Sequence, residues 1–463
     1  MSVLATRYAS KEMREIWSPE NKIKAERKLW IAVMRFQASA LNIPADAIAN
    51  YEAVIEKVDL ASIDEREKKI RHDVKARIDE FNALAGYEFI HLGMTSRDLT
   101  ENIEAAQILG ALKLIQERTA SLLFQLGEKA ELYKTLPIVG RSHNVPAQLT
   151  TLGKKFATIA EELLFAFERV NNLIARYPLR GFKGPVGTSQ DMRDLLGSAA
   201  EIEREVAKSL GFNRTLDSSA QVYPRSFDFD VLSALVQLSA APANLATSIR
   251  LMAGYELVSE GFTPNQVGSS AMPHKMNSRS CERINGLAVV LRGYLSMISE
   301  VTGDQWNEGD VSDSVVRRVA LSDAFYSMDA IIETTLTVLN EFGIFTANIN
   351  REIEEQLPFL ATTKFLMAAV KAGAGRESAH EALKELATKA LIAKREGKEL
   401  SLIDLIAADP RIPLDKSVLE DLVKNPIEFI GDATSQSERV MARIATAIKP
   451  FPASPTYRPG AIR

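Results

Sequence analysis

Apolar residues recur along the chain at intervals of three and four, the period of an α-helix that buries one face. One such series alternates between the two intervals: Ile108, Leu112, Ile115, Thr119, Leu122 and Leu126. A second includes small residues that let helices approach closely: Val316, Ala320, Ala324, Met328, Ile331, Thr335 and Leu339. Alternating strand patterns flanked by hairpin turns are scarce. The pattern predicts an all-α chain with long packed helices in its middle.

Proline and the capping residues support this prediction. Proline breaks helix interiors, and it is absent from residues 45–136, 147–177 and 274–357. Asp98 followed by Glu101 has the spacing of a capping box and predicts the start of the helix that carries the first series. A turn is predicted after a helix that ends near 177, at Gly181, Gly184 and Gly187.

The length of 463 residues predicts two to four domains, because one compact core rarely grows so large. From about Ala361 the helices look shorter and more charged, as in a separate small domain. The end, KPFPASPTYRPGAIR, is rich in proline and predicts an extended tail.

Composition changes the picture mainly by exclusion. A net charge of −4, with acids and bases mixed throughout, does not support a nucleic-acid-binding surface. The single cysteine, Cys281, excludes an internal disulfide framework and a multi-cysteine metal site. We find no signal-peptide pattern at the start and no run of about 18 apolar residues, so we expect a cytoplasmic protein that binds no membrane.

Four histidines lie in unusual settings, within the segments RHD, HLGMTS, GRSHN and MPHK; they are His72, His91, His143 and His274. Taken singly, each is better explained by a structural, hydrogen-bonded role than by a catalytic one. The fifth, His380, lies in an amphipathic stretch and is interpreted as structural or exposed. None has the HExxH spacing of a helical zinc site, so we predict no metal.

A long Gly- and Ser-rich loop is predicted at Gly261–Ser280, and it contains the segment GSSAMPHK from Gly268 to Lys275. The segment is neither a nucleophile elbow nor a P-loop. Paired serines with backbone amides, followed by a lysine, could hold a carboxylate or an alkoxide. A plain surface loop is the alternative interpretation, because long loops are often, but not always, functional.

The segment GSSAMPHKMN resembles the signature loop of the fumarase/aspartase superfamily, GSSxMPxKxNP. Further segments are similar to the adenylosuccinate lyase family within it: RHDV, HLGMTSRD, GRSHNVPAQLTTLGKKFA and QVYPRSFDFDVLSAL. The similarity runs in order from Arg7 to about Arg318 and continues more loosely beyond. Several ordered motifs over hundreds of residues are stronger evidence than any single one.

The resemblance implies three helical domains: 1–102, a central long-helix bundle at 103–360, and a C-terminal domain with an extended tail at 361–463. It implies a homotetramer with active sites shared between subunits and no cofactor. The implied reaction is the anti β-elimination of fumarate from two purine nucleotide substrates of purine biosynthesis. These are adenylosuccinate, which yields AMP, and succinylaminoimidazole carboxamide ribotide.

By the same resemblance, Ser269 is the base that takes the carbon proton, and His143 is the acid that protonates the departing nitrogen. Lys275 and loop amides would stabilise the serine alkoxide. Other positions match substrate-binding residues of the family, at the carboxylates, the purine or the phosphate: Arg7, Tyr8, Arg71, His72, Asp73, His91, Thr95, Ser96, Ser142, Gln221, Ser270, Lys275, Asn277, Arg283, Ser314 and Arg318.

Several positions depart from the family pattern. Asn144-Val145 replaces a frequent Gly-Gln or Gly-Val after the acid histidine, and Met276 and Ser278 replace the common Arg and Pro of the loop. Gly309 occupies a position where many relatives have a substrate-binding arginine, and glycine cannot supply that charge. Neither catalytic position is lost, so we expect an active enzyme.

Three alternatives remain at this point. One is another elimination of the superfamily, such as that of a cycloisomerase or an argininosuccinate lyase, against which the MPHK segment and the Arg7-Tyr8 start argue. A second is a silent nucleotide-binding relative, which would be expected to have lost Ser269 or His143. A third is a helical scaffold, which would not need a Gly- and Ser-rich loop between long helices.

Overall fold

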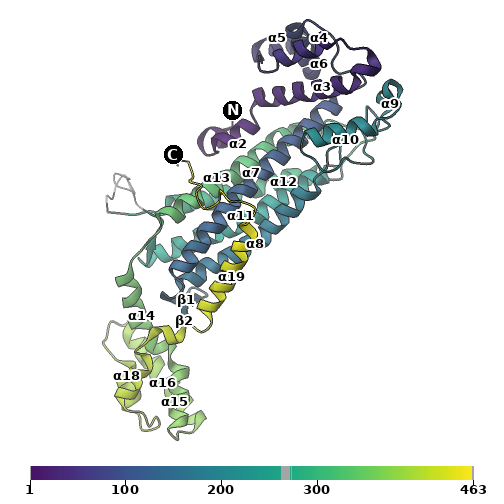
Figure 1. Cartoon of the computed structure of the whole chain (residues 1–463). Helices are drawn as coiled ribbons and strands as arrows, with labels where there is room; N and C mark the ends of the chain where they lie inside the picture. The colour runs from purple at the N-terminus through teal and green to yellow at the C-terminus, as the bar shows by residue number, and fades with distance from the viewer. Residues whose placement is uncertain (1, 262–271, 273, 461–463) are drawn as a thin grey trace.

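Long helices form a bundle along the length of the molecule, with smaller helical parts at both ends (Figure 1). The computed structural model describes residues 2–261, 272 and 274–460. In the bundle, α11 packs against three of the other long helices, and α7 packs against α8 and α13. The prediction of an all-α chain is confirmed. The bundle consists of α7 (Ser96–Leu132), α8 (Leu152–Arg176), α11 (Ser226–Gly254), α12 (Arg279–Glu300) and α13 (Asp313–Glu341).

The two predicted apolar series form the inner faces of α7 and α13. Every member of the first series is buried, and the second is buried from Ala320 to Leu339, with Val316 half-buried. Each fully buried leucine or isoleucine contributes roughly 2 kcal/mol through removal of apolar surface from water. The period of the sequence therefore places the correct face of each helix in the core.

The start of α7 differs from the prediction. The N-cap is Thr95, and Asp98 is the third helical residue, whose carboxylate accepts the Thr95 backbone N–H at 2.8 Å. The prediction that Asp98 is the N-cap and Glu101 its capping-box partner is therefore wrong, because the helix begins one turn earlier. Glu101 instead forms a buried ion pair with Arg225 at 2.9 Å, because a buried carboxylate needs a cationic partner. Local spacing alone did not reveal this long-range partner.

The N-terminal part lies beside and above one end of the bundle (Figure 1). Its helices are α1 (Val3–Arg7), α2 (Lys11–Ile16), α3 (Pro19–Leu41), α4 (Ala45–Ala53), α5 (Leu60–Ile70) and α6 (Asp73–Ala85). Two further helices follow the turn after α8, which ends at Arg176 as predicted. They are α9 (Gln190–Leu196) and α10 (Ala200–Ser209).

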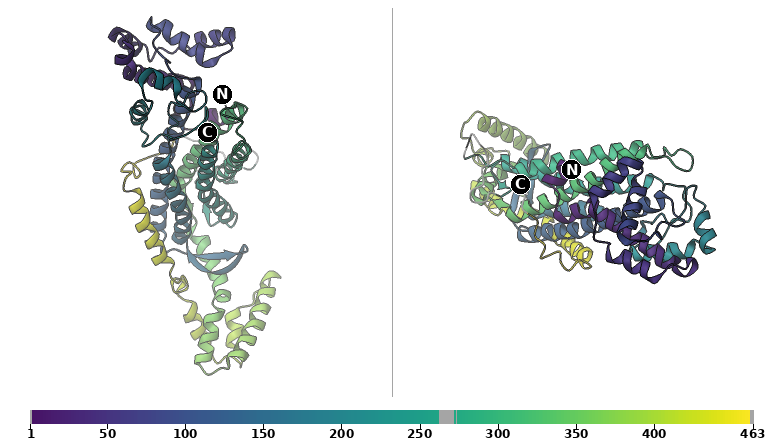
Figure 2. Two further views of the ribbon diagram at one scale, coloured as in Figure 1. Left: turned by 90° about the vertical axis from the view of Figure 1, so that its right-hand side faces the viewer. Right: turned by 90° about the horizontal axis from the view of Figure 1, so that it is seen from above.

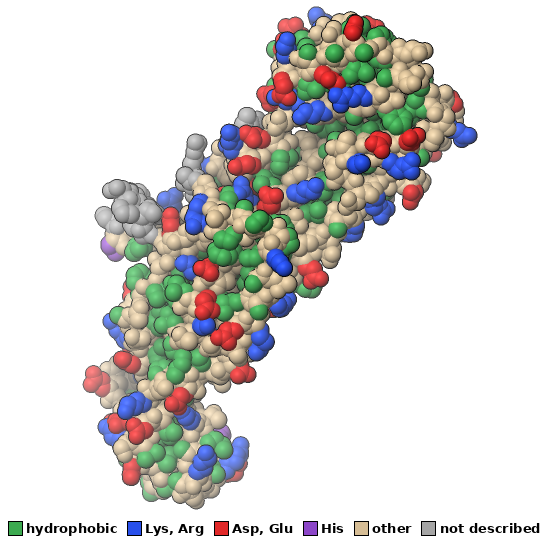
Figure 3. Space-filling view, viewed as in Figure 1, with side chains coloured by type: hydrophobic (Ala, Val, Ile, Leu, Met, Phe, Trp, Pro, Cys, Tyr) green, Lys and Arg blue, Asp and Glu red, His purple; other side chains and the backbone are tan. Residues whose placement is uncertain are grey.

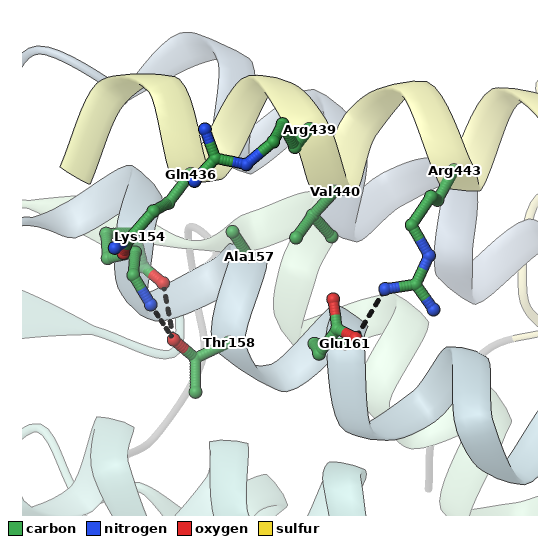
Figure 4. Close-up of a pocket in the computed structure, with 8 residues that line it drawn as sticks. All are labelled: Lys154, Ala157, Thr158, Glu161, Gln436, Arg439, Val440 and Arg443. Atoms are coloured by element: carbon green, nitrogen blue, oxygen red, sulfur yellow. Dashed lines mark hydrogen bonds and ion pairs between the residues drawn. The ribbon is translucent and has the colours of Figure 1, made fainter. Parts of the chain in front are cut away.

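The C-terminal part has a hydrophobic core of its own, which includes Phe365, Leu402, Ile406 and Leu419. The last helix, α19, leaves this part and packs along α7 and α8 (Figure 4). The elements are α14 (Thr346–Leu360), α15 (Thr362–Lys371), α16 (Arg376–Arg395), α17 (Leu402–Ala407), α18 (Lys416–Val423), a 3₁₀ helix η1 (Pro426–Phe429) and α19 (Ala433–Ile448).

Within the described residues, two short antiparallel strand pairs interrupt the helices. One pairs β1 (Pro137–Ser142) with β2 (Val145–Thr151), and the other pairs β3 (Val258–Ser259) with β4 (Gly343–Ile344). The first pair projects from the side of the molecule as a ribbon (Figure 2). The strand β1 begins a few residues after α7 ends at Leu132. The C-terminal end of α7 therefore positions the β1–β2 hairpin and its tip.

Acidic and basic side chains are interspersed over the face drawn in Figure 3, in keeping with the small net charge. Within the described part of the chain, one helix, α11, is long and apolar enough to span a membrane. It packs against α8, α12 and α13, and much of its apolar surface, including Leu232, Leu235 and Leu238, belongs to the bundle core. A core helix of a soluble bundle meets the same criterion, so α11 is weak evidence for a membrane span.

Candidate active site

A first cluster of predicted site residues surrounds the start of α7. Thr95 and Ser96 are held there by Asp98, which forms an ion pair with Arg180 at 2.6 Å; both side chains are fully buried. The same carboxylate accepts backbone N–H groups from Lys183 and Gly184 at 3.0 and 3.1 Å. A buried carboxylate that accepts hydrogen bonds from this many donors makes the start of α7 rigid.

His91 precedes this helix start in a left-handed backbone conformation, with φ of 65°. Its Nδ1 accepts the indole N–H of Trp30 at 3.0 Å, so the neutral ring carries its proton on Nε2. Burial, with a smaller contribution from nearby His72 and Lys75, lowers the pKa of His91 to about 4. The ring is therefore neutral near pH 7, with its N–H on Nε2.

Arg71, His72 and Asp73 lie at the start of α6, with His72 as its N-cap. Burial opposes ionisation of Asp73, but Arg77, a backbone N–H and Arg318 outweigh it and hold the pKa of Asp73 below its usual value. Because Arg318 lies on α13, this electrostatic contact joins the N-terminal part to the bundle.

Gln221 and Ser314 complete the first cluster. The Gln221 backbone N–H donates to the carbonyl of Glu308 at 2.7 Å. A Cβ atom on Gly309 would lie 2.5 Å from Gln221 Oε1, so only glycine fits there without displacing the amide. Ser314 lies in the first turn of α13. The first cluster comprises Arg71, His72, Asp73, His91, Thr95, Ser96, Gln221, Ser314 and Arg318.

A second cluster, Ser142 and His143, lies at the tip of the β1–β2 hairpin. Ser142 pairs with Val145, which leaves His143 and Asn144 as a two-residue turn. Both turn residues have positive φ, 52° and 62°, as a type I′ turn requires. Asparagine tolerates this conformation better than most residues, so Asn144 suits the second position of the turn. The His143 side chain is exposed at this tip.

A third cluster contains Arg7, Tyr8 and Arg283. The guanidinium carbons of Arg7 and Arg283 lie 5.7 and 5.4 Å from the centre of the Tyr8 ring. Burial, together with the nearby charges of Arg7 and Arg279, lowers the pKa of Arg283, although Tyr8 opposes this. Cations crowded in this way favour an anionic ligand.

Two predicted loop residues, Lys275 and Asn277, line a cavity of about 380 Å³ beside Glu260. Glu260 accepts the backbone N–H groups of Ser280 and Cys281 at 2.9 and 2.8 Å and so holds the start of α12 against this cavity. We count both residues with the third cluster. The predicted base Ser269 and its neighbour Ser270 lie outside the described residues.

The first and second clusters are far apart in one chain. Thr95 and Ser96 begin α7, whose 37 residues span about 55 Å, and the hairpin that carries His143 follows its other end. A six-residue strand covers about 20 Å, so folding straight back would still leave about 35 Å between them. A single chain therefore does not bring the predicted acid to the first cluster.

Sequence reasoning missed two residues beside the third cluster. Asp329, a buried acid on α13, accepts a hydrogen bond from the Ser10 backbone at 2.6 Å. Arg458, in the C-terminal tail, lines a cavity together with Arg7 and Arg283. Asp329 stands between Met328 and Ile331 of the second apolar series, and an acid inside such a series could have drawn attention to it. No local signal distinguishes Arg458 from an ordinary tail residue.

The sequence matches two protein families. The family described as "Lyase" matches residues 4–293, and "Adenylosuccinate lyase C-terminus" matches residues 358–440. Among curated proteins, the adenylosuccinate lyase of Saccharomyces cerevisiae is 35% identical, over 97% of this chain and 95% of that protein. The adenylosuccinate lyase of Schizosaccharomyces pombe is 33% identical, over the same shares of the two chains.

Solved structures show the same fold in more distant proteins. The crystal structure of 3-carboxy-cis,cis-muconate lactonizing enzyme from Pseudomonas putida has a TM-score of 0.85, at 21% identity. The match covers 96% of this chain and 99% of that one. At this identity the likeness shows the fold alone and carries no information on the reaction.

Proposed function

The chain belongs to the adenylosuccinate lyase family, and we propose that it catalyses the β-elimination of fumarate from adenylosuccinate, which leaves AMP. The same carbon–nitrogen cleavage converts succinylaminoimidazole carboxamide ribotide to aminoimidazole carboxamide ribotide. The observation that carries the proposal is likeness over nearly the whole chain to adenylosuccinate lyases, at 35% identity to the first of them. The predicted acid and base, His143 and Ser269, are both present in the sequence.

The reaction sets demands that these residues can meet. A proton leaves the succinyl carbon next to a carboxylate, the electrons form the new C=C bond, and the C–N bond breaks with its pair going to nitrogen. The proton is weakly acidic, so negative charge on the carboxylate must be stabilised by preorganised donors. We assign the carboxylates to Thr95, Ser96, Ser142, Lys275 and Asn277.

We assign the carbon proton to Ser269 and protonation of the nitrogen to His143. Imidazole titrates near neutral pH and so can supply a proton there. The Lys275 ammonium would favour the serine alkoxide. His91, neutral with its proton on Nε2, suits a donor that orients substrate. Gln221 would orient the leaving base, and arginines of the first and third clusters would bind the phosphate.

We further propose that the active sites are shared between the subunits of a homotetramer. The separation of about 35 Å or more between Thr95 and His143 supports this, because one chain cannot close the site. A cytoplasmic location suits an enzyme of nucleotide metabolism. The three domains at 1–102, 103–360 and 361–463 remain part of this proposal.

The activity is tested by incubating the purified protein with adenylosuccinate and measuring fumarate and AMP. We expect turnover by the wild type and its loss in both Ser269→Ala and His143→Ala. A surface variant at another histidine, His380→Ala, is the matched control and should keep full activity. No turnover of either substrate by folded wild-type protein would refute the proposed reaction.

Sharing of the sites is tested by mixing two inactive variants. Thr95→Ala and His143→Ala lie in different clusters, so random mixed tetramers should regain activity in about one quarter of the sites. Thr95→Ala mixed with Arg318→Ala is the control, since both belong to the first cluster and should give no recovery. Equal results from the two mixtures would contradict shared sites.

A further inference from the structure

The described part of the C-terminal tail lies beside the N-terminal segment, and residues of both line one cavity (Figure 1). The Tyr457 hydroxyl donates to Glu333 at 2.6 Å, and the Gly460 backbone N–H donates to the same carboxylate at 3.0 Å. The Arg118 guanidinium lies 3.5 Å from the centre of the Tyr457 ring. These contacts join the tail to α13 and α7, so Arg458, which lies between Tyr457 and Gly460, has a defined position.

That position opens onto a cavity of about 320 Å³. Arg458 lines it from the tail, Arg7 and Tyr8 from the N-terminal segment, and Arg283 from α12. Three arginines from three separate parts of the chain thus face one space. The planar guanidinium donates hydrogen bonds in pairs and suits phosphate oxygens better than a point charge does.

The acids in the cavity wall already have partners. Glu12 and Glu333 lie 3.7 and 3.6 Å from the guanidinium of Arg118. Across the described residues, neither Arg7 nor Arg458 has a carboxylate within 4.0 Å, and Arg458 donates to the carbonyls of Pro455 and Tyr457. The lining has four cationic side chains, Arg7, Lys11, Arg283 and Arg458, and two carboxylates, Glu12 and Glu333, so positive charge is in excess.

We propose that Arg458 is a phosphate-binding residue, which joins Arg7 and Arg283 around the 5′-phosphate of the nucleotide. This rests on the proposed function, and it makes the C-terminal tail part of the substrate site. The ligand class is a nucleoside monophosphate, recognised through its dianionic phosphate by three guanidinium groups.

The test is direct binding of AMP and of adenosine, by titration calorimetry, to the full-length wild type and to Arg458→Ala. A charge-assisted hydrogen bond to phosphate is worth about tenfold or more in affinity. We expect AMP to bind about tenfold more weakly to Arg458→Ala and adenosine to bind equally to both. Arg458→Lys should recover part of the loss, and Arg395→Ala, an exposed arginine of α16, should change neither affinity.

Two outcomes would overturn the proposal: unchanged AMP affinity in Arg458→Ala, or equal weakening of AMP and adenosine, which would indicate that the tail only supports the fold. Tyr457→Phe, which loosens the tail without removing the arginine, separates these effects. Turnover is measured separately. If the wild type binds AMP but releases no fumarate from adenylosuccinate, the proposed reaction fails while the affinities still test Arg458. A wild type that does not bind AMP would refute both.

Discussion

Ser10 and Asp329 join the N-terminal segment to the centre of α13. The Asp329 carboxylate accepts the Ser10 backbone N–H at 2.6 Å and its hydroxyl at 3.1 Å, although the residues are 319 positions apart. The Ser10 hydroxyl also accepts the backbone N–H of Met13 at 3.2 Å and so caps α2. This contact holds Arg7 and Tyr8, three and two residues earlier, against the bundle.

The Ser10–Asp329 contact predicts a pH dependence of stability. Burial is the main reason that the pKa of Asp329 rises to about 7 from its ordinary 3.8. The folded chain therefore binds this proton more tightly than the unfolded chain, and stability falls as pH rises from about 4 to about 7, by up to roughly 4 kcal/mol. We expect Asp329→Asn, which keeps the acceptor oxygen, to remove much of this fall.

The measurement is the thermal unfolding midpoint at about pH 5 and about pH 8 for both proteins. Ser10→Ala is a useful companion, because it removes the hydroxyl donor but leaves the backbone donor in place. An identical midpoint difference between the two pH values in the wild type and Asp329→Asn would show that Asp329 does not titrate in this range.

The buried ion pair of Asp98 and Arg180 predicts a large stability loss on removal of one charge. In Asp98→Asn, Arg180 would remain buried without its counter-charge, which costs roughly 3–5 kcal/mol. The start of α7, with Thr95 and Ser96, would loosen as well. Denaturant unfolding measures the loss, with Asp64→Asn as control, because the Asp64–Lys68 pair is exposed. Similar small effects from both variants would contradict this prediction.

His91 is expected to affect the rate without contributing to the pH profile. Its pKa of about 4 keeps the ring neutral throughout the neutral range. His91→Asn, whose amide oxygen can accept from Trp30, should lower kcat but leave the acid limb of the kcat/KM profile between about pH 5.5 and 8.5 in place. A limb that moves with this substitution would show that His91 is a titrating group of the reaction.

Gly309 is expected to be intolerant of any side chain. Gly309→Ala forces Gln221 to move, and a displacement of about 1 Å at an orienting group can cost tenfold or more in kcat/KM. Thermal stability should change little, because the position is exposed. Gly375→Ala is the control, since a Cβ there meets Ser378 at an ordinary 4.0 Å. Full activity in Gly309→Ala would contradict the proposed role of Gln221.

The sequence predicted the helical class and the buried faces of α7 and α13, because helical period and core-facing side chains are local properties. It also predicted, by resemblance, which residue types belong to the site. The β1–β2 hairpin was missed as a structural element. Its turn depends on positive φ at His143 and Asn144, and histidine is not a strong turn signal.

Only the tertiary structure decided how the site residues are grouped. The partners of the buried acids Asp98 and Asp329 are Arg180 and Ser10, which lie 82 and 319 positions away in sequence. Periodicity has no information at such separations. The length of α7 separates Thr95 from His143, and the folded tail brings Arg458 to Arg7. Sequence pattern determines what each segment can form, whereas packing in three dimensions determines which side chains meet.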